Sequence, residues 1–127
     1  MLDTKDCLDN KCPIQFTLDL IGNKWSILIL RELFLGDRRT HQFLDALPGI
    51  SSKTLTIRLR ELEAHGLVQR QVYPEIPPRV EYSLTEKGRE IQPVMSALYR
   101  VGRNWLQEDA CLCPLEKTIF AELETAS

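Results

Sequence analysis

The feature that most constrains the fold is a change of hydrophobic period near the middle of the chain. Ser51, a residue type favoured just before the first turn of a helix, precedes three leucines at helical spacing: Leu55, Leu59 and Leu62. Gly66 ends that pattern, and residues 67–73 and 79–84 then alternate as strands do, on either side of a proline-rich segment. The order predicts a capped helix followed directly by a β-hairpin with a stiff tip.

Helical periodicity covers most of the remaining sequence. We expect helices over residues 13–21 and 24–35, a short helix capped by Thr40 that stops at Pro48, and a long last helix capped by Thr85. Gly88 and Pro93 near the start of the last helix predict that its first turns are bent or separate. The fold class is therefore mainly α with a small β-hairpin, and two short helices followed by a hairpin indicate a winged helix-turn-helix.

The charge distribution limits the kinds of partner. The formal net charge of −2 excludes a protein that coats nucleic acid by bulk positive charge. Residues 38–79, however, hold seven basic and four acidic residues, whereas residues 106–127 hold five acidic residues and one basic residue. A length of 127 residues suits one domain, and nothing in the sequence divides residues 1–127. With no apolar run of membrane-spanning length and no targeting segment, we expect a cytoplasmic protein with no membrane contact.

The helix after Ser51 could present a DNA-binding face opposite its leucines. At about 100° per residue, that face carries hydroxyl, amine and guanidinium groups that can bind phosphates and base edges, and one isoleucine that can meet a thymine methyl group. The candidate DNA contacts there are Ser51, Ser52, Lys53, Thr56, Ile57 and Arg60. The alternative is an ordinary solvated helix face with one exposed isoleucine.

Three further arginines are candidate DNA contacts. Arg79 follows two prolines at the hairpin tip, which would hold its guanidinium out from the body toward phosphate or a minor groove. Arg38 and Arg39 precede the first helix of the pair. The alternatives are that Arg79 pairs with Glu75 or Glu81, and that Arg38 and Arg39 are merely a solvated helix start.

Several motifs in a fixed order resemble one known family over about residues 12–107. They are Cys12-Pro13-Ile14, Ile21-Gly22-Asn23-Lys24-Trp25, Gly49-Ile50-Ser51, Leu59-Arg60-Glu61-Leu62, Gly66-Leu67-Val68 and the segment from Pro77 to Thr85. This order is similar to that of the HxlR-type winged helix-turn-helix regulators of bacteria, which are related to the MarR group. The resemblance implies a transcriptional regulator rather than an enzyme. It also implies a homodimer joined by terminal helices, with the Ser51 helix in the major groove of a palindromic double-stranded DNA operator and the wing on flanking DNA. Residues 108–127 form an acidic extension beyond the shared stretch.

The four cysteines lie near the two ends of the chain: Cys7, Cys12, Cys111 and Cys113. A helix N-terminus and the neighbouring Lys11 favour the thiolate of Cys12, although it could equally be a small capping residue. The family resemblance implies sensing of oxidants or quinones at Cys12, in some members through an intersubunit disulfide to a C-terminal cysteine. We therefore expect a redox- or electrophile-responsive regulator in which all four cysteines are candidates.

Three other functions stay open on the sequence. The regulator could be constitutive or ligand-responsive with structural cysteines, or its winged helix could contact protein instead of DNA. A thiol enzyme is a weaker alternative, because the chain has neither a Cys-x-x-Cys pair nor a base close to a cysteine. The cysteine spacing also fits no common zinc site, so we predict no metal and no cofactor.

Overall fold

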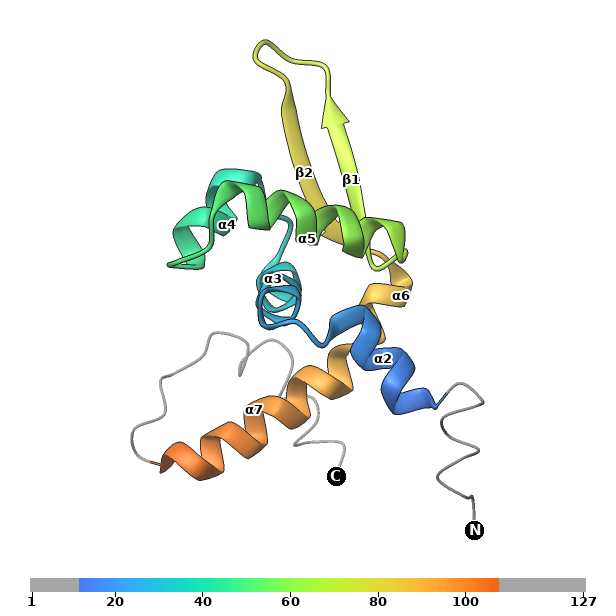
Figure 1. The fold of residues 1–127 in the computed structure, drawn as a ribbon. Coiled ribbons are helices and arrows are strands. Elements are labelled where there is room, and N and C mark those ends of the chain that lie inside the picture. Colours follow the sequence, from blue (N-terminus) through green and yellow to red (C-terminus); the bar gives the residue numbers. More distant parts are fainter. Residues whose placement is uncertain (1–11, 108–127) are drawn as a thin grey trace.

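The computed structural model describes residues 12–107, which are mainly helical with one antiparallel hairpin (Figure 1). The elements in chain order are α2 (Pro13–Ile21), α3 (Lys24–Leu35), α4 (Thr40–Ala46), α5 (Ser52–Ala64), β1 (Val68–Tyr73), β2 (Arg79–Leu84), α6 (Glu86–Arg89) and α7 (Gln92–Leu106). The fold class predicted from the sequence, a winged helix-turn-helix, is confirmed. None of the described helices is long and apolar enough to cross a membrane.

Helix α3 is the centre of the core. It lies between α5 on one side and α2 and α7 on the other (Figure 1), and it buries Ile29, Leu30 and Leu33. Helix α5 closes the core with the three predicted leucines, Leu55, Leu59 and Leu62, each at most 2% exposed. The leucine spacing that dominates the sequence therefore fixes which face of α5 points inward and which points outward.

Side-chain caps define the starts of α3 and α5, and the Ser51 cap of α5 is the one predicted from the sequence. The Asn23 side chain accepts a 2.8 Å hydrogen bond from the Trp25 amide, and the Ser51 hydroxyl accepts one of 3.0 Å from the Thr54 amide. The prediction that Thr40 caps α4 is wrong. Arg39 is the extended residue before the helix, and its amide donates to the Gln42 side chain at 2.8 Å. The backbone is extended at Arg39 and helical from Thr40, so Thr40 is the first residue of the helix and not its cap.

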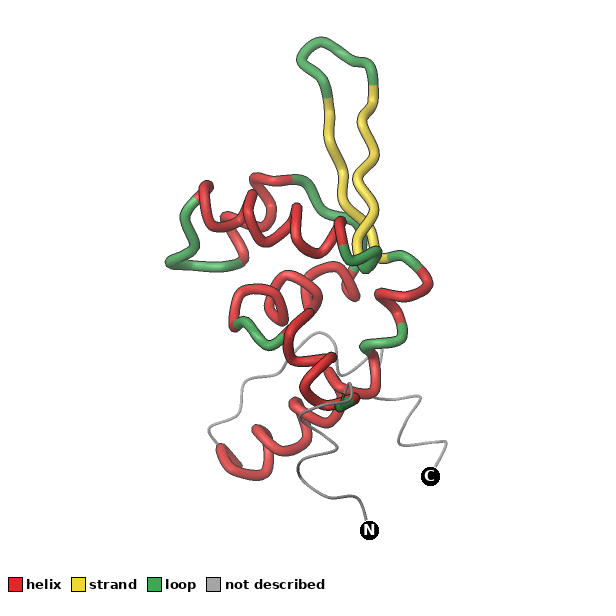
Figure 2. Tube along the Cα trace, turned by 45° about the vertical axis from the view of Figure 1, so that its right-hand side comes forward, coloured by secondary structure: helices red, strands yellow, loops and turns green. Residues whose placement is uncertain are grey.

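The wing consists of two strands, and a third segment of the chain pairs with β2 at one position. Strands β1 and β2 pair in the register Val68 with Leu84 through Tyr73 with Arg79, and rise from the helical body (Figure 2). Arg38 adds an isolated antiparallel bridge to Tyr82, with backbone hydrogen bonds of 3.0 and 2.8 Å. The segment leading into α4 therefore covers part of the outer edge of β2 and ties the wing to the helix-turn-helix.

The last predicted helix is two helices, which is one of the two outcomes that Gly88 and Pro93 allow. Helix α6 begins at its Thr85 cap and lasts one turn, and Pro93 lies in the first turn of α7. Gly88 is buried against the backbone of Leu67, the residue before β1. A Cβ atom at position 88 would overlap the carbonyl oxygen of Leu67. This close approach fixes α6 against the base of the wing and directs α7 away from it (Figure 1).

Candidate nucleic-acid interface

The outward face of α5 is polar and exposed, as its sequence predicts. Its six candidate residues are all exposed: Ser51, Ser52, Lys53, Thr56, Ile57 and Arg60. Ile57 is 44% exposed, so its side chain is accessible on the same face as Lys53 and Arg60. Within residues 12–107, neither Lys53 nor Arg60 forms an ion pair, so both cations can meet an external anion.

Two of the hydroxyl groups on this face also have structural roles. Ser51 caps α5 and donates a 3.0 Å hydrogen bond to the Thr54 hydroxyl. The Thr56 hydroxyl donates to the Ser52 carbonyl oxygen, four residues earlier, at 2.9 Å. Both oxygens keep acceptor capacity, but their hydrogens are used inside the helix. Lys53 and Arg60 are therefore the cationic donors on α5 that can bind an anion without breaking an internal hydrogen bond.

Arg79 differs from the pose that the proline-rich tip predicts. Its guanidinium is folded back rather than held out from the body, with Nη2 3.5 Å from Glu75 Oε1 and Nε 3.7 Å from Glu81 Oε1. It also lies over the ring of Tyr73, the residue opposite it on β1, at 4.1 Å from the ring centroid. The pairing with Glu75 and Glu81, which the sequence left open as the alternative, is therefore what the structure contains.

The two arginines before α4 occupy different environments. Arg38 takes part in the backbone bridge to the wing, and its Nε lies 4.0 Å from Oε1 of the buried Glu32, with only 24% of its side chain exposed. Arg39 is 43% exposed in its side chain, and its Nε lies 3.5 Å from Glu81 Oε1. The structure thus gives Arg38 a role in joining α3 to the wing and leaves Arg39 at the surface.

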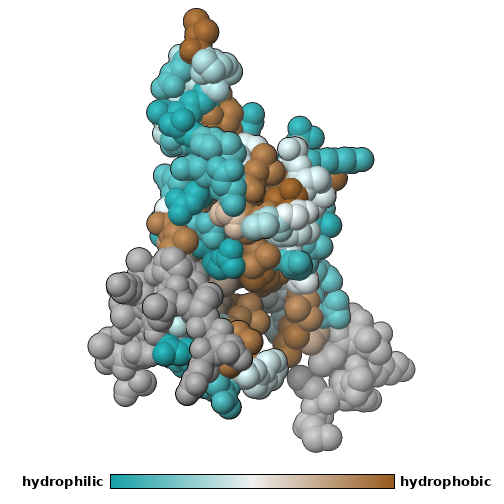
Figure 3. Space-filling view, turned by 90° about the vertical axis from the view of Figure 1, so that its left-hand side faces the viewer, coloured by the Kyte–Doolittle hydropathy of each residue, from teal (hydrophilic) through white to brown (hydrophobic). Residues whose placement is uncertain are grey.

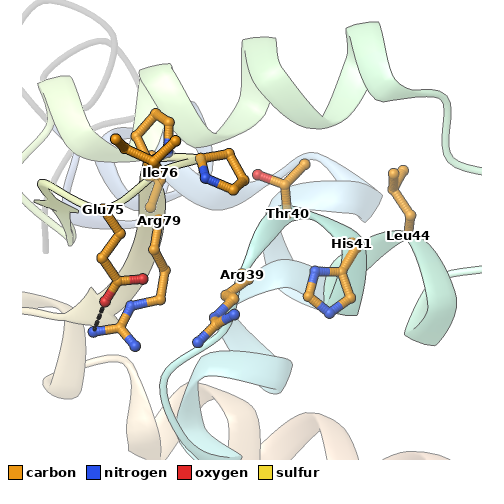
Figure 4. A pocket seen from close by; sticks show the side chains of 10 residues that line it. Arg39, Thr40, His41, Leu44, Glu75, Ile76 and Arg79 are labelled. Atoms are coloured by element: carbon orange, nitrogen blue, oxygen red, sulfur yellow. Dashed lines mark ion pairs between the residues drawn. The ribbon is translucent and has the colours of Figure 1, made fainter.

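A hollow of about 590 Å³ separates the start of α4 from the wing tip (Figure 4). Arg39, His41 and Leu44 line one side, and Ile76 and Arg79 line the other. Sequence reasoning missed Ile76, whose side chain is fully exposed where the wing ends in a hydrophobic tip (Figure 3). The signal that could have found it is an isoleucine among prolines in a loop with no core to enter.

A second surface lies at the opposite end of the molecule, along α7 and α2. Helix α7 buries only Met95 and Ser96. Its outward face exposes a row of apolar side chains, which line a shallow groove: Val94, Leu98, Val101 and Trp105. Helix α2 exposes three more: Ile14, Phe16 and Leu18. The four residues of α7 are called the terminal apolar face below, while on α2 Ile14 and Leu18 lie on one side of the helix and Phe16 on the other. A face of this kind marks an interaction site rather than ordinary surface.

Cys12 is the only one of the four cysteines within the described residues, since Cys7, Cys111 and Cys113 lie outside them. It occupies the N-cap position of α2, as predicted, and is half-buried. Its carbonyl oxygen accepts the first helical hydrogen bond, from the Phe16 amide at 2.8 Å. The helix N-terminus that the sequence analysis expects beside this thiol is present.

Comparison with known proteins gives a consistent result. The sequence profile of the HxlR-like helix-turn-helix family matches residues 20–110. The HTH-type transcriptional regulator sll1512 of Synechocystis is 66% identical over 104 residues, covering 82% of this chain and 77% of the relative. The redox regulator HypR in its oxidized form superposes with a TM-score of 0.69 at 40% identity, covering 80% of this chain and all of HypR. The reduced form of the regulator YodB from Bacillus subtilis gives a TM-score of 0.66 at 36% identity, covering 78% and 98%.

Proposed function

The chain belongs to the HxlR-like helix-turn-helix family and is a DNA-binding transcriptional regulator, not an enzyme, and from this premise we propose how it works. It acts as a homodimer on a palindromic operator. Helix α5 enters the major groove, and the wing lies along the flanking backbone or minor groove. Oxidation or an electrophile at its cysteine thiols changes the affinity for the operator.

The observation that carries the DNA-binding mode is the outward face of α5. It presents Lys53 and Arg60, which have no ion-pair partner within residues 12–107, beside the exposed Ile57. A helix with such a face suits the major groove, where cationic donors meet phosphates and base edges and an apolar side chain can meet a thymine methyl group. The wing beside α5 supports contact with the adjoining DNA.

The terminal apolar face supports the homodimer. Leu98 is 51% exposed and Trp105 is 81% exposed in the described chain. A second copy can cover this face by an isologous contact, in which the same residues meet across a two-fold axis. Two-fold symmetry would then place two α5 helices on two half-sites of opposite direction, which is why a palindrome is proposed.

Redox control is supported by Cys12 and by two structural neighbours. HypR is described as a redox regulator, and YodB is also known in a diamide-treated form. Cys12 lies at the N-terminus of α2, a helix at the same end of the molecule as the terminal apolar face (Figure 1). A disulfide or adduct there would act at the subunit contact. It would thereby change the separation of the two α5 helices, which the operator spacing must match.

The test is DNA binding by the full chain under reducing and oxidising conditions. A duplex selected from a random library against the reduced protein should contain an inverted repeat and bind tightly in fluorescence anisotropy. Diamide should alter that affinity and produce a crosslinked dimer on a non-reducing gel, and Cys12→Ser should abolish both effects. Selection of no duplex would refute the DNA-binding mode. A diamide-insensitive affinity would refute only the redox part.

A further inference from the structure

The wing, which is proposed to contact DNA, carries two acidic residues next to Arg79. They differ in their place along the hairpin and in their exposure. Glu75 lies in the loop at the tip, and 53% of its side chain is exposed. Glu81 lies within β2, and only 25% of its side chain is exposed. Acidic groups facing DNA normally weaken binding, so their positions require a physical reason.

Glu81 is the meeting point of two arginines from different elements. The antiparallel bridge between Arg38 and Tyr82 places the next residue, Arg39, opposite Glu81, and Arg79 lies two positions from Glu81 on the same face of β2. The same oxygen, Glu81 Oε1, is 3.5 Å from Arg39 Nε and 3.7 Å from Arg79 Nε. The Glu81 carboxylate therefore lies between two guanidinium groups. Both arginines line the hollow between α4 and the wing (Figure 4).

These ion pairs leave hydrogen-bonding capacity unused. Both Nε distances exceed that of a hydrogen bond between charged groups, which is about 2.7–2.9 Å. Arg79 Nε is buried and has no hydrogen-bond partner, although Tyr73 fixes the plane of its guanidinium from one side. Arg79 Nε itself is enclosed, but 43% of the Arg39 side chain and 29% of the Arg79 side chain stay exposed. The two guanidinium groups can therefore meet an external anion that has several acceptor oxygens.

We propose that Glu81 is a positioning residue that holds Arg39 and Arg79 as a clamp for one backbone phosphate of the operator. The proposal rests on the proposed function, because it requires that the wing contact operator DNA. Glu75 has a different role. It is an exposed counter-ion of Arg79 alone, and a DNA phosphate replaces it on binding. Loss of Glu75 therefore removes a competitor, whereas loss of Glu81 lets two like charges separate.

The test compares two substitutions that remove the same charge from the same wing. Affinity is measured by fluorescence anisotropy on the duplex selected against the wild-type protein. Glu75→Gln should tighten binding by about threefold, because one repulsive or competing charge is lost. Glu81→Gln should weaken binding by about threefold or more despite the identical change in net charge. Glu90→Gln, at the exposed residue that follows α6, is the control for net charge and should change little.

A second measurement separates positioning from a general loss of structure. Replacing single operator phosphates by neutral methylphosphonate should reveal one phosphate whose loss weakens the wild-type protein but has a much smaller effect on Glu81→Gln and on Arg39→Ala. Inorganic phosphate should compete no better than chloride at equal ionic strength, since the occupant is a DNA phosphodiester.

The outcomes are distinct. If Glu81→Gln tightens binding as Glu75→Gln does, or if no phosphate shows this coupling, the clamp is refuted while the regulator still binds DNA. Strong competition by inorganic phosphate would instead assign the site to a free anion and would also overturn the proposal. If the wild-type protein selects no duplex, the proposed function itself fails.

Discussion

Helices α5 and α7 have similar lengths but differ in what each leaves on the surface. Helix α5 buries all three of its leucines within one chain, and its exposed face is polar apart from Ile57. Helix α7 buries only Met95 and Ser96 and exposes apolar side chains along its outer face, including Trp105 at 81%. The difference shows that α5 is complete within one chain and presents groups suited to an aqueous, charged partner. Among residues 12–107, nothing covers the apolar outer face of α7, and the proposed dimer assigns that place to a second copy.

The largest expected effect on operator affinity comes from a substitution that disrupts the apolar face of α7 and leaves α5 unchanged. Leu98→Glu places a carboxylate in the middle of the terminal apolar face, where burial of an unpaired charge would oppose association. We expect a dimer-to-monomer shift in sedimentation velocity and a fall in operator affinity of roughly a hundredfold or more, because bivalent binding is lost.

The control for that experiment is Arg100→Glu, which introduces the same side chain on α7 but at an exposed position turned away from the apolar row. It should remain a dimer. If Leu98→Glu also remains a dimer with undiminished affinity, α7 does not form the subunit contact, and the terminal apolar face has another occupant.

The second prediction concerns α6, which joins the wing to α7. Gly88→Ala would push a Cβ atom into the backbone carbonyl of Leu67, and a main-chain atom cannot move aside as a flexible side chain can. We expect a loss of about 2 kcal/mol or more in the free energy of unfolding, measured by urea denaturation. Arg89→Ala, at the next position and exposed, should change stability by less than about 0.5 kcal/mol. Equal stability for the two variants would contradict the close packing at Gly88.

The third prediction tests the polar end. Arg60→Ala and Lys53→Ala should each lower operator affinity by about tenfold and reduce the slope of log affinity against log salt by about one. Dimerisation should be unchanged, in contrast to Leu98→Glu. Arg89→Ala removes the same charge from α6, outside the proposed interface, and serves as the matched control. Binding that is equally strong in all three variants would show that α5 does not carry the contact.

Most of the fold could be predicted from the sequence because local signals coincide with tertiary ones. Leu55, Leu59 and Leu62 are spaced for a helix and are also the residues that the core needs, and Ser51 caps that helix as expected. The prediction of a Thr40 cap is wrong because the residue before α4 follows a long-range backbone bridge between Arg38 and Tyr82. No local pattern reports a contact between residues so far apart in the chain.

The candidate site divides in the same way. The exposed face of α5 follows from helical angle alone, so its residues could be named without coordinates. The position of the Arg79 guanidinium could not be predicted in this way. It depends on competition between solvent, the Tyr73 ring and two carboxylates within its reach. Cross-strand register decides that competition, and the shared carboxylate of Glu81 becomes visible only when the α4 entry and β2 are placed side by side.

The smallest effect expected, and the one most specific to the comparison, is at Ile57. It is the single large apolar residue on the outward face of α5, and at 44% exposure it has little to gain from the core. If it meets a thymine methyl group, Ile57→Ala should weaken operator binding by about threefold and should lower discrimination at one base pair without changing the salt dependence, since no charge is altered. Replacing that thymine by uracil should weaken the wild-type protein by a similar factor and leave the Ile57→Ala variant unaffected. A variant that still distinguishes thymine from uracil would exclude the contact. If Ile57→Ala weakens dimerisation more than Arg60→Ala does, Ile57 belongs to the subunit contact with the apolar residues of α7. The functional distinction between α5 and α7 would then fail.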